Sequence, residues 1–327
     1  MQIILRTLAP VALGLLCAAP ALGQSTATYP SHPITLVVPF TPGTGIDILA
    51  RAIGPRLVQR WGQPVIVDNK PGASGNIGAE FVGKAAPNGY TLMVTVNTFT
   101  ITPALYRNLP YDPIKDFTPI AKIALASYAF AVNPVVLPAK DLSEVLADAK
   151  ARPGQLNYGS PGSGTPHHLA MELLKLHLGL DIVHVPYKGL SGAMTDLLGG
   201  QVQMMFAPVH TLLPQGRAGK LRLVAVTGPA RSPLAPEVPT FREQGIDFMD
   251  DVDAWYAVMG PAKIPPEIVA ALNREIGAIM NAPEVRENLL KQGLVPVTST
   301  PGELAALIKS DLARWAKMVA EAKITAD

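Results

Sequence analysis

Two glycine-rich segments contain the residue types best suited to hold an anion. The segment at 39–47 reads PFTPGTGID and follows the apolar run 34–38, whereas the segment at 159–168 reads GSPGSGTPHH and follows a shorter apolar run. Each precedes a helix-like pattern, so unpaired backbone N–H groups and the positive end of a helix would point at one place. Neither segment contains Lys or Arg. We predict that the two turns hold a small carboxylate between two lobes.

A structural role for the first turn is the alternative. Thr44 would then cap the following helix, and Asp47, three residues later, would complete a capping box. For Asp47 we favour this role, because its carboxylate would repel a bound anion. For the glycines and threonines both roles stay open. A dinucleotide-binding turn is excluded, since Ile48 stands where a third glycine is required.

The second turn contains a serine and two histidines, which raises the question of catalysis or metal binding. A nucleophile elbow at Ser160 would need glycine where Tyr158 stands. His167 and His168 on one helix would point about 100° apart, and no further ligand stands at zinc spacing. We therefore predict no catalytic residue, no metal and no cofactor. One of the histidines should instead form a hydrogen bond at the helix start.

Two further segments are expected to contribute to the cleft. A third strand, turn and helix start at 185–191 contains Tyr187 and Gly189. Asn97 follows the apolar run 91–96 and would lie at the carboxyl end of a strand, where open α/β sheets bind ligands. Trp255 and Tyr256 are placed to cover the pocket.

The N-terminus has the pattern of a secretory signal. Arg6 precedes an apolar run to Ala18, and a small-x-small site ends at Gly23. We predict a signal peptide at 1–23, cleaved near Gly23, and a periplasmic location. The run is too short to span a bilayer, which needs about 20 apolar residues. A net charge of +2 without a cluster of Lys and Arg argues against a nucleic-acid-binding surface.

From Ile34 onward, short β-branched runs alternate with helix-period runs, which predicts an α/β fold with a mixed, mostly parallel sheet in each lobe. Strands are expected at 34–39, 65–69, 91–96, 130–133, 157–158, 183–186, 204–207, 223–227 and 254–259. Helices are expected at 47–60, 75–84, 142–151, 165–178, 191–198 and 212–218, and in the tail at 265–280, 283–292 and 301–322.

The tail helices have too few strands to form a core of their own, so we expect them to pack on the first lobe. The chain would then cross between the lobes twice, at 123–130 and at 248–256, and form a hinge. We predict lobe 1 at 24–126 together with 250–327, and lobe 2 at 127–249. Thr300, Pro301 and Glu303 predict a capped start for the last helix.

Seven short motifs follow one another along the chain: VPFTPG at 38–43, DILAR at 47–51, DNKPGASG at 68–75, PNGYTL at 87–92, VPYKG at 185–189, DLLGG at 196–200 and AVTG at 225–228. They resemble the motifs of the Bug family, the substrate-binding receptors of tripartite tricarboxylate transporters. Each motif is weak alone, but the ordered set is specific and covers essentially the whole mature chain. The resemblance implies a two-lobed type II periplasmic-binding-protein fold, which closes on its ligand like a flytrap.

The resemblance also implies that main-chain amides, hydroxyls and ordered waters hold the ligand carboxylates, without an arginine clamp. The matching positions are Phe40, Thr41, Gly43, Thr44, Gly162, Ser163, Gly164, Thr165 and His168. Together with Asn97, Tyr187 and Gly189, which are inferred from the residues above, they are the predicted ligand-binding residues. The chain departs from the family at Ala207-Pro208, where an Asp-Asn pair is common. The loss of that carboxylate disfavours an amino-bearing ligand.

The expected partners are a small organic acid, with one to three carboxylates, and an inner-membrane permease or sensor protein; we expect a monomer that binds no nucleic acid. Two other functions stay open. One is a ligand-reporting partner of a signalling receptor without a transport role. The other is a hydrolase or lyase that uses His168 with Ser160 or Ser163.

Overall fold

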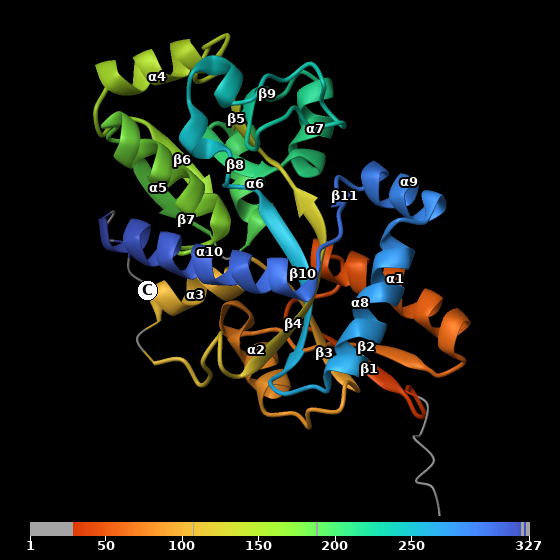
Figure 1. Cartoon of the computed structure of the whole chain (residues 1–327). Coiled ribbons are helices and arrows are strands. Elements are labelled where there is room, and N and C mark those ends of the chain that lie inside the picture. Colours follow the sequence, from red (N-terminus) through yellow and green to blue (C-terminus); the bar gives the residue numbers. More distant parts are fainter. Residues whose placement is uncertain (1–28, 107, 188, 322–323, 325–327) are drawn as a thin grey trace, which may run out of the picture.

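The structure is a computed structural model that describes residues 29–106, 108–187, 189–321 and 324. The predicted signal peptide at 1–23 lies outside these residues. Figure 1 shows two lobes, each built around its own sheet, and β4 and β10 run between them.

The first sheet has six strands in the order β11-β4-β10-β3-β1-β2. The strand β1 pairs in parallel with β2 and β3, whereas β10 is antiparallel to both β3 and β4. The bounds are β1 Ile34–Val38, β2 Val65–Asn69, β3 Thr91–Val96, β4 Phe117–Ala126, β10 Ala254–Pro261 and β11 Val295–Pro296.

The second sheet has five strands in the order β7-β6-β8-β5-β9. The strand β6 is parallel to β7 and β8, and β5 is antiparallel to β8 and β9. The bounds are β5 Tyr128–Val132, β6 Asn157–Ser160, β7 Val183–Pro186, β8 Met204–Pro208 and β9 Arg222–Val226. In each sheet the strand that precedes a glycine-rich turn, β1 or β6, therefore lies between two parallel neighbours.

Helices cover both sheets. Around the first sheet lie α1 Gly45–Trp61, η1 Ala73–Gly75, α2 Asn76–Gly83, α3 Thr98–Leu105, α8 Pro266–Met280, α9 Pro283–Lys291 and α10 Pro301–Glu321. Around the second lie α4 Leu142–Ala151, α5 Pro166–Leu178, α6 Leu190–Gly199, α7 Val209–Arg217, η2 Arg242–Gln244 and η3 Asp247–Met249.

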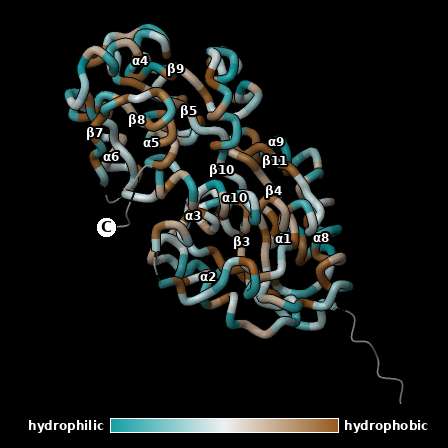
Figure 2. The backbone as a smooth tube through the Cα atoms, turned by 60° about the vertical axis from the view of Figure 1, so that its left-hand side comes forward, coloured by the Kyte–Doolittle hydropathy of each residue, from teal (hydrophilic) through white to brown (hydrophobic). Residues whose placement is uncertain are grey.

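The main hydrophobic core is continuous from one lobe to the other. It contains Leu36 and Val94 under α1, Tyr256 and Tyr128 where the chain crosses, and Phe206 in the second sheet. Figure 2 shows hydrophobic residues concentrated along the inner strands and hydrophilic residues on outer loops. Burial of this apolar surface is the main favourable contribution to folding.

The tail helices return to the first lobe, as expected. The helix α8 packs on α1 and β4, and α10 packs on α3 and β4. In Figure 1, α10 lies across the junction of the lobes. Its Trp315 and Met318 share a hydrophobic cluster with Leu169 of α5, so the last helix contacts both lobes. Its predicted capping box is confirmed: Glu303 N–H donates to Thr300 Oγ1 at 3.2 Å, and Thr300 N–H donates to Glu303 Oε2 at 2.8 Å.

The sequence analysis missed the strands β4 and β11, the helix α3 and the short turns η2 and η3. The strand β4 was expected only as an extended crossing from Ile123, because Pro119 and Lys122 interrupt its apolar pattern. The helix α3 follows Asn97 directly, where only a polar strand end was expected. Its three threonines favour strand by propensity, but the packing of α3 on α10 favours helix here.

Candidate functional site

The first glycine-rich turn is held in shape by the carboxylate of Asp47. Its Oδ2 accepts hydrogen bonds from the N–H of Gly43 at 3.0 Å and from Nε of Arg51 at 2.9 Å. Its Oδ1 accepts from Nδ2 of Asn69 at 3.1 Å. Burial alone would raise the pKa of Asp47, but these hydrogen bonds lower it below its usual value. The predicted structural role of Asp47 therefore has a geometric basis.

The predicted cap at Thr44 is wrong in detail. Thr44 occupies the N-cap position of α1, but its side chain accepts no capping hydrogen bond. Its Oγ1 instead donates to the carbonyl of Thr41 at 3.0 Å. Asp47 reaches back past Thr44 to Gly43, because Gly43 has a φ of +84° that turns its N–H toward the carboxylate.

The second glycine-rich turn is held by neutral groups. Thr165 is the N-cap of α5, and its Oγ1 donates to the Gly162 carbonyl at 2.8 Å. The ring of His168 accepts a hydrogen bond at Nδ1 from the N–H of Gly164 at 2.9 Å. His168 also stacks on His184, with ring centroids 3.9 Å apart and an interplanar angle of 8°. This confirms that one histidine of the pair forms a hydrogen bond at the helix start.

Several amides predicted to hold the ligand already have acceptors within the protein. Besides Gly43 and Gly164, the N–H of Gly162 donates to Ser160 Oγ at 3.2 Å, and the N–H of Thr165 donates to the Gly162 carbonyl at 3.3 Å. Within the described residues of the two turns, N–H groups without an acceptor are found at Thr44, Gly45, Ile46 and His167. The first turn of a helix leaves such donors free, so the available amides lie at the start of α1 and α5.

The starts of α1 and α5 each face a tyrosine at the crossing between the lobes. A Cβ on Gly45 of α1 would lie 2.8 Å from Tyr256 Oη. The ring of His167 in α5 meets the ring of Tyr128 edge-on, at 5.1 Å between centroids. Burial raises the pKa of Tyr128 well above its usual value, and a charge on Tyr256 or Asp253 would raise it further, so these groups are within electrostatic reach. The two predicted turns thus come together through Tyr128 and Tyr256.

The lobes also touch directly beside the second turn. Gly164 has a φ of +73°, a conformation that favours glycine, and a Cβ there would meet Cδ1 of Leu105 in α3. A side chain at this position would have to displace the end of Leu105, which belongs to the other lobe.

The other predicted site residues lie in different settings. Asn97 is fully buried as the N-cap of α3; its N–H donates to the Trp255 carbonyl, and its Oδ1 has no hydrogen-bond partner among the described residues. Phe40 packs against Gly75. Tyr187 is held on α6, where its hydroxyl donates to Asp196 Oδ2 at 2.7 Å. Gly189 is the N-cap of α6, next to open space.

Comparison with known proteins gives the family. The family described as "Tripartite tricarboxylate transporter family receptor" matches residues 49–324. Protein BugT of Bordetella pertussis is 35% identical over 319 residues, which cover 97% of this chain and 97% of BugT. The chain belongs to this receptor family. Receptors of the family with solved structures include the periplasmic binding protein BugD, and the predicted two-lobed fold is confirmed.

Two solved relatives of this receptor contain bound acids. R. palustris Rpa4515, solved with adipate, has a TM-score of 0.81 and 34% identity, over 91% of this chain and 100% of that chain. MatC (Rpa3494) from Rhodopseudomonas palustris, solved with bound malate, has a TM-score of 0.76 and 32% identity, over 89% of this chain and 100% of that chain.

The receptor contains a serine and histidine in contact, but not the pair considered for a hydrolase. Ser160 Oγ lies 2.6 Å from Nε2 of His184, a residue that the sequence did not single out. Ser160 is fully buried, and its hydroxyl donates to the Gly162 carbonyl at 3.1 Å. The pair therefore lies beneath the second turn.

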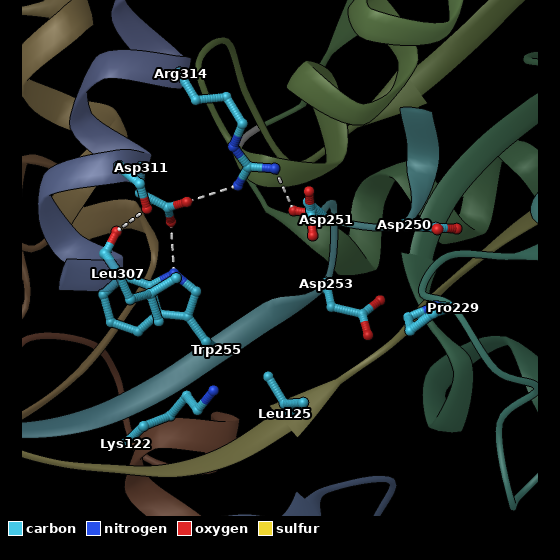
Figure 3. A pocket seen from close by; sticks show the side chains of 11 residues that line it. Lys122, Leu125, Pro229, Asp250, Asp251, Asp253, Trp255, Leu307, Asp311 and Arg314 are labelled. Carbon is cyan, nitrogen blue, oxygen red and sulfur yellow. Dashed lines mark hydrogen bonds and ion pairs between the residues drawn. The ribbon is translucent and has the colours of Figure 1, made fainter. Parts of the chain in front are cut away.

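A cavity of about 440 Å³ lies on the opposite face of β10 from Tyr256. It is lined by Trp255, the neighbour of Tyr256, and successive strand residues point to opposite faces. Figure 3 shows Arg314 between Asp311 and the segment at Asp251, with Asp253 beside it. The four aspartates of its lining outnumber the two basic residues, Lys122 and Arg314. The lining is therefore acidic and would repel an anion.

Among the described residues, no group of three or more His, Cys, Asp or Glu side chains is arranged to hold a metal ion. Within the same part of the chain, no helix combines the length and apolar character needed to cross a bilayer.

Proposed function

We propose that this receptor binds a small organic carboxylate between its two lobes and presents it to a membrane permease. The observation that supports this most directly is the pairing of two helix starts, from α1 in one lobe and α5 in the other, at the crossing tyrosines. Both starts have N–H groups without acceptors and carry the positive end of a helix dipole. The adipate and malate in Rpa4515 and MatC support the same ligand class.

The charge distribution favours one anion rather than a cation. Within the described turns the guanidinium of Arg51 is already paired with Asp47, so the positive potential comes from backbone dipoles. Charge-assisted hydrogen bonds contribute about 1.5–3 kcal/mol each. A few of them would suffice for micromolar binding, which corresponds to about −8 kcal/mol.

The receptor would close by rotation of its two lobes about the crossing segments. Lobe 1 would comprise 24–126 with 250–327, and lobe 2 would comprise 127–249. The ligand would stabilise the closed form because it contacts both lobes. The receptor would act in the periplasm, as its family does, after removal of residues 1–23, and it would have no catalytic role.

The experiment is a thermal-shift panel of mono-, di- and tricarboxylates on the purified receptor, with mass spectrometry of any acid released from it. Thr44→Pro tests the site, because the φ of −76° at Thr44 suits proline while the substitution removes a free N–H. We expect at least one acid to raise the melting temperature of the wild type. Thr44→Pro should weaken the affinity for that acid about tenfold.

Thr44→Ala is the matched control, since it removes the hydroxyl but keeps the N–H. Equal affinity in Thr44→Pro and Thr44→Ala would contradict the site, and no stabilisation by any acid would contradict the function. If an acid binds but a permease deletion leaves its uptake unchanged, the sensor function replaces the transport function.

A further inference from the structure

We propose that Tyr128 and Tyr256 are ligand-contacting residues, whose hydroxyl groups donate hydrogen bonds to the carboxylate held between α1 and α5. This inference rests on the proposed function and adds its specificity-determining side chains. The sequence placed Tyr256 only as a cover over the pocket and did not single out Tyr128.

The two tyrosines differ from other buried tyrosines of the receptor. Tyr111 donates to Asn76 Oδ1 at 2.7 Å, and Tyr158 donates to Glu172 Oε1 at 2.5 Å. The hydroxyls of Tyr128 and Tyr256, by contrast, have no hydrogen-bond partner among the described residues, although only 3% and 7% of these residues is exposed. Both side chains are thus buried, and no described residue occupies their hydroxyls.

Each tyrosine lies at a helix start whose amides have no acceptor among the described residues. Tyr256 Oη is 2.8 Å from the Cβ position of Gly45, and the amides concerned are the N–H groups of Gly45 and Ile46. The ring of Tyr128 meets the ring of His167, whose N–H and two buried ring nitrogens likewise have no partner in the described part of the chain. One lobe therefore offers a phenol and helix-start amides, and the other lobe offers the same combination.

The chemistry of this group of donors selects an anion that accepts several hydrogen bonds. A carboxylate has two oxygens and about four acceptor positions. Burial raises the pKa of Tyr256 to about 12, so its phenol stays protonated and acts as a donor. Asp253, which is within electrostatic reach of Tyr128, accepts hydrogen bonds from Thr227 Oγ1 at 2.6 Å and Ser127 Oγ at 3.2 Å. Its carboxylate also lines the acidic cavity on the opposite face of β10 from Tyr256.

The positions of the two residues also couple binding to closure. Tyr128 is the first residue of β5, directly after one crossing, and Tyr256 lies in β10, directly after the other. A carboxylate bonded to both hydroxyls would join the lobes at the hinge itself. Only a contact that differs between the open and closed forms can shift their populations.

The test is isothermal titration calorimetry with adipate and with malate on wild type, Tyr128→Phe, Tyr256→Phe and Tyr111→Phe. We expect each of the first two variants to bind the effective acid about tenfold more weakly. Their ligand-free melting temperatures should match wild type, because the lost hydroxyls have no hydrogen-bond partner in the described part of the chain. Tyr111→Phe is the control, and it should melt earlier while keeping wild-type affinity.

The outcomes separate this inference from the proposed function. If wild type binds neither these two acids nor any of the carboxylate panel, the proposed function fails and the inference fails with it. If wild type binds an acid and both hinge variants bind it equally well, only the inference is overturned. A lower melting temperature with unchanged affinity in Tyr128→Phe or Tyr256→Phe would show a structural role and also overturn it.

Discussion

The two glycine-rich turns lie at equivalent strand-to-helix junctions, but different chemistry holds each in shape. The turn before α1 is held by an ionised carboxylate, Asp47, with Arg51 and Asn69 around it. The turn before α5 is held by a hydroxyl cap, Thr165, and by the ring of His168. One turn therefore depends on charge, and the other depends on neutral groups.

This difference has a functional consequence for an anion receptor. The negative charge of Asp47 is matched by Arg51, so the first turn presents little net charge to a ligand. The second turn is held by a hydrogen bond from the Gly164 N–H to Nδ1 of His168. The first turn should resist acid, because the pKa of Asp47 is lowered by its hydrogen bonds.

The largest effect is expected from Asp47→Ala in the first turn. It removes the acceptor of Gly43, Arg51 and Asn69 at once, and hydrogen bonds to a charged acceptor contribute about 1.5–3 kcal/mol each. The free energy of unfolding should fall by about 3–4 kcal/mol, measured by urea denaturation.

Asp68→Ala is the matched control on the adjacent strand. Asp68 pairs with Lys70 at 3.0 Å, but 40% of its side chain is exposed. Its loss should change the free energy of unfolding by less than about 1 kcal/mol. Equal effects at the two positions would show that Asp47 does not hold the first turn.

The second largest effect concerns pH and the groups at the crossing. Burial raises the pKa of Asp253 to about 6, so its contribution to stability is lost as pH rises through 6. Burial lowers the pKa of His167 to about 4, so its contribution is lost as pH falls from 6.5 toward 4. The two contributions oppose each other between pH 4 and 6.5, whereas the lowered pKa of Asp47 keeps the first turn ionised there.

Single variants should expose each contribution. Relative to wild type, Asp253→Asn should lose up to about 3 kcal/mol of stability on acidification from pH 7 to pH 4. His167→Gln should gain a similar amount over the same interval. The measurement is urea denaturation at several pH values. If the free energy of unfolding changes with pH in the same way in wild type and both variants, Asp253 and His167 do not make these opposing contributions.

The smallest effect is expected from His168→Phe in the second turn. Phenylalanine can keep the stack on His184 but leaves the Gly164 N–H without an acceptor. Unfolding free energy should fall by about 1–2 kcal/mol. His177→Phe, at an exposed position of the same helix, should change it by less than about 0.5 kcal/mol. A loss in His177→Phe as large as in His168→Phe would contradict this comparison.

Much of the fold could be predicted because the sequence marks its strands clearly. The bounds of β2, β3 and β7 agree with the predicted ranges, since β-branched runs there are bounded by Pro, Gly or Asn. The strand β4 and the helix α3 could not be predicted, because each is stabilised by partners distant in the chain: β10 for β4, and α10 for α3. Local propensity is a weak guide where such packing decides.

The sequence predicted which segments form the candidate site, but not which of their hydrogen-bond donors are available to a ligand. Glycines and polar residues after strands located both turns, and Asp47 was placed correctly as a brace. The acceptors that occupy the amides of Gly162 and Gly164 come from side chains whose direction no spacing rule gives. Tyr128 and Tyr256 meet the turns only after both sheets have formed, so their place beside Gly45 and His167 follows from tertiary structure alone.

The pairing of β4 with β10 has a mechanical consequence. Ala126, the last residue of β4, lies opposite Ala254, the first residue of β10, in the antiparallel register. The two connections therefore leave one lobe as a paired two-stranded ribbon and not as two independent strands. Such a ribbon bends more easily perpendicular to its face than within its plane. The lobes should therefore rotate about a single hinge axis. A single pair of fluorescent labels, on α2 and α4, should then report the full range of opening.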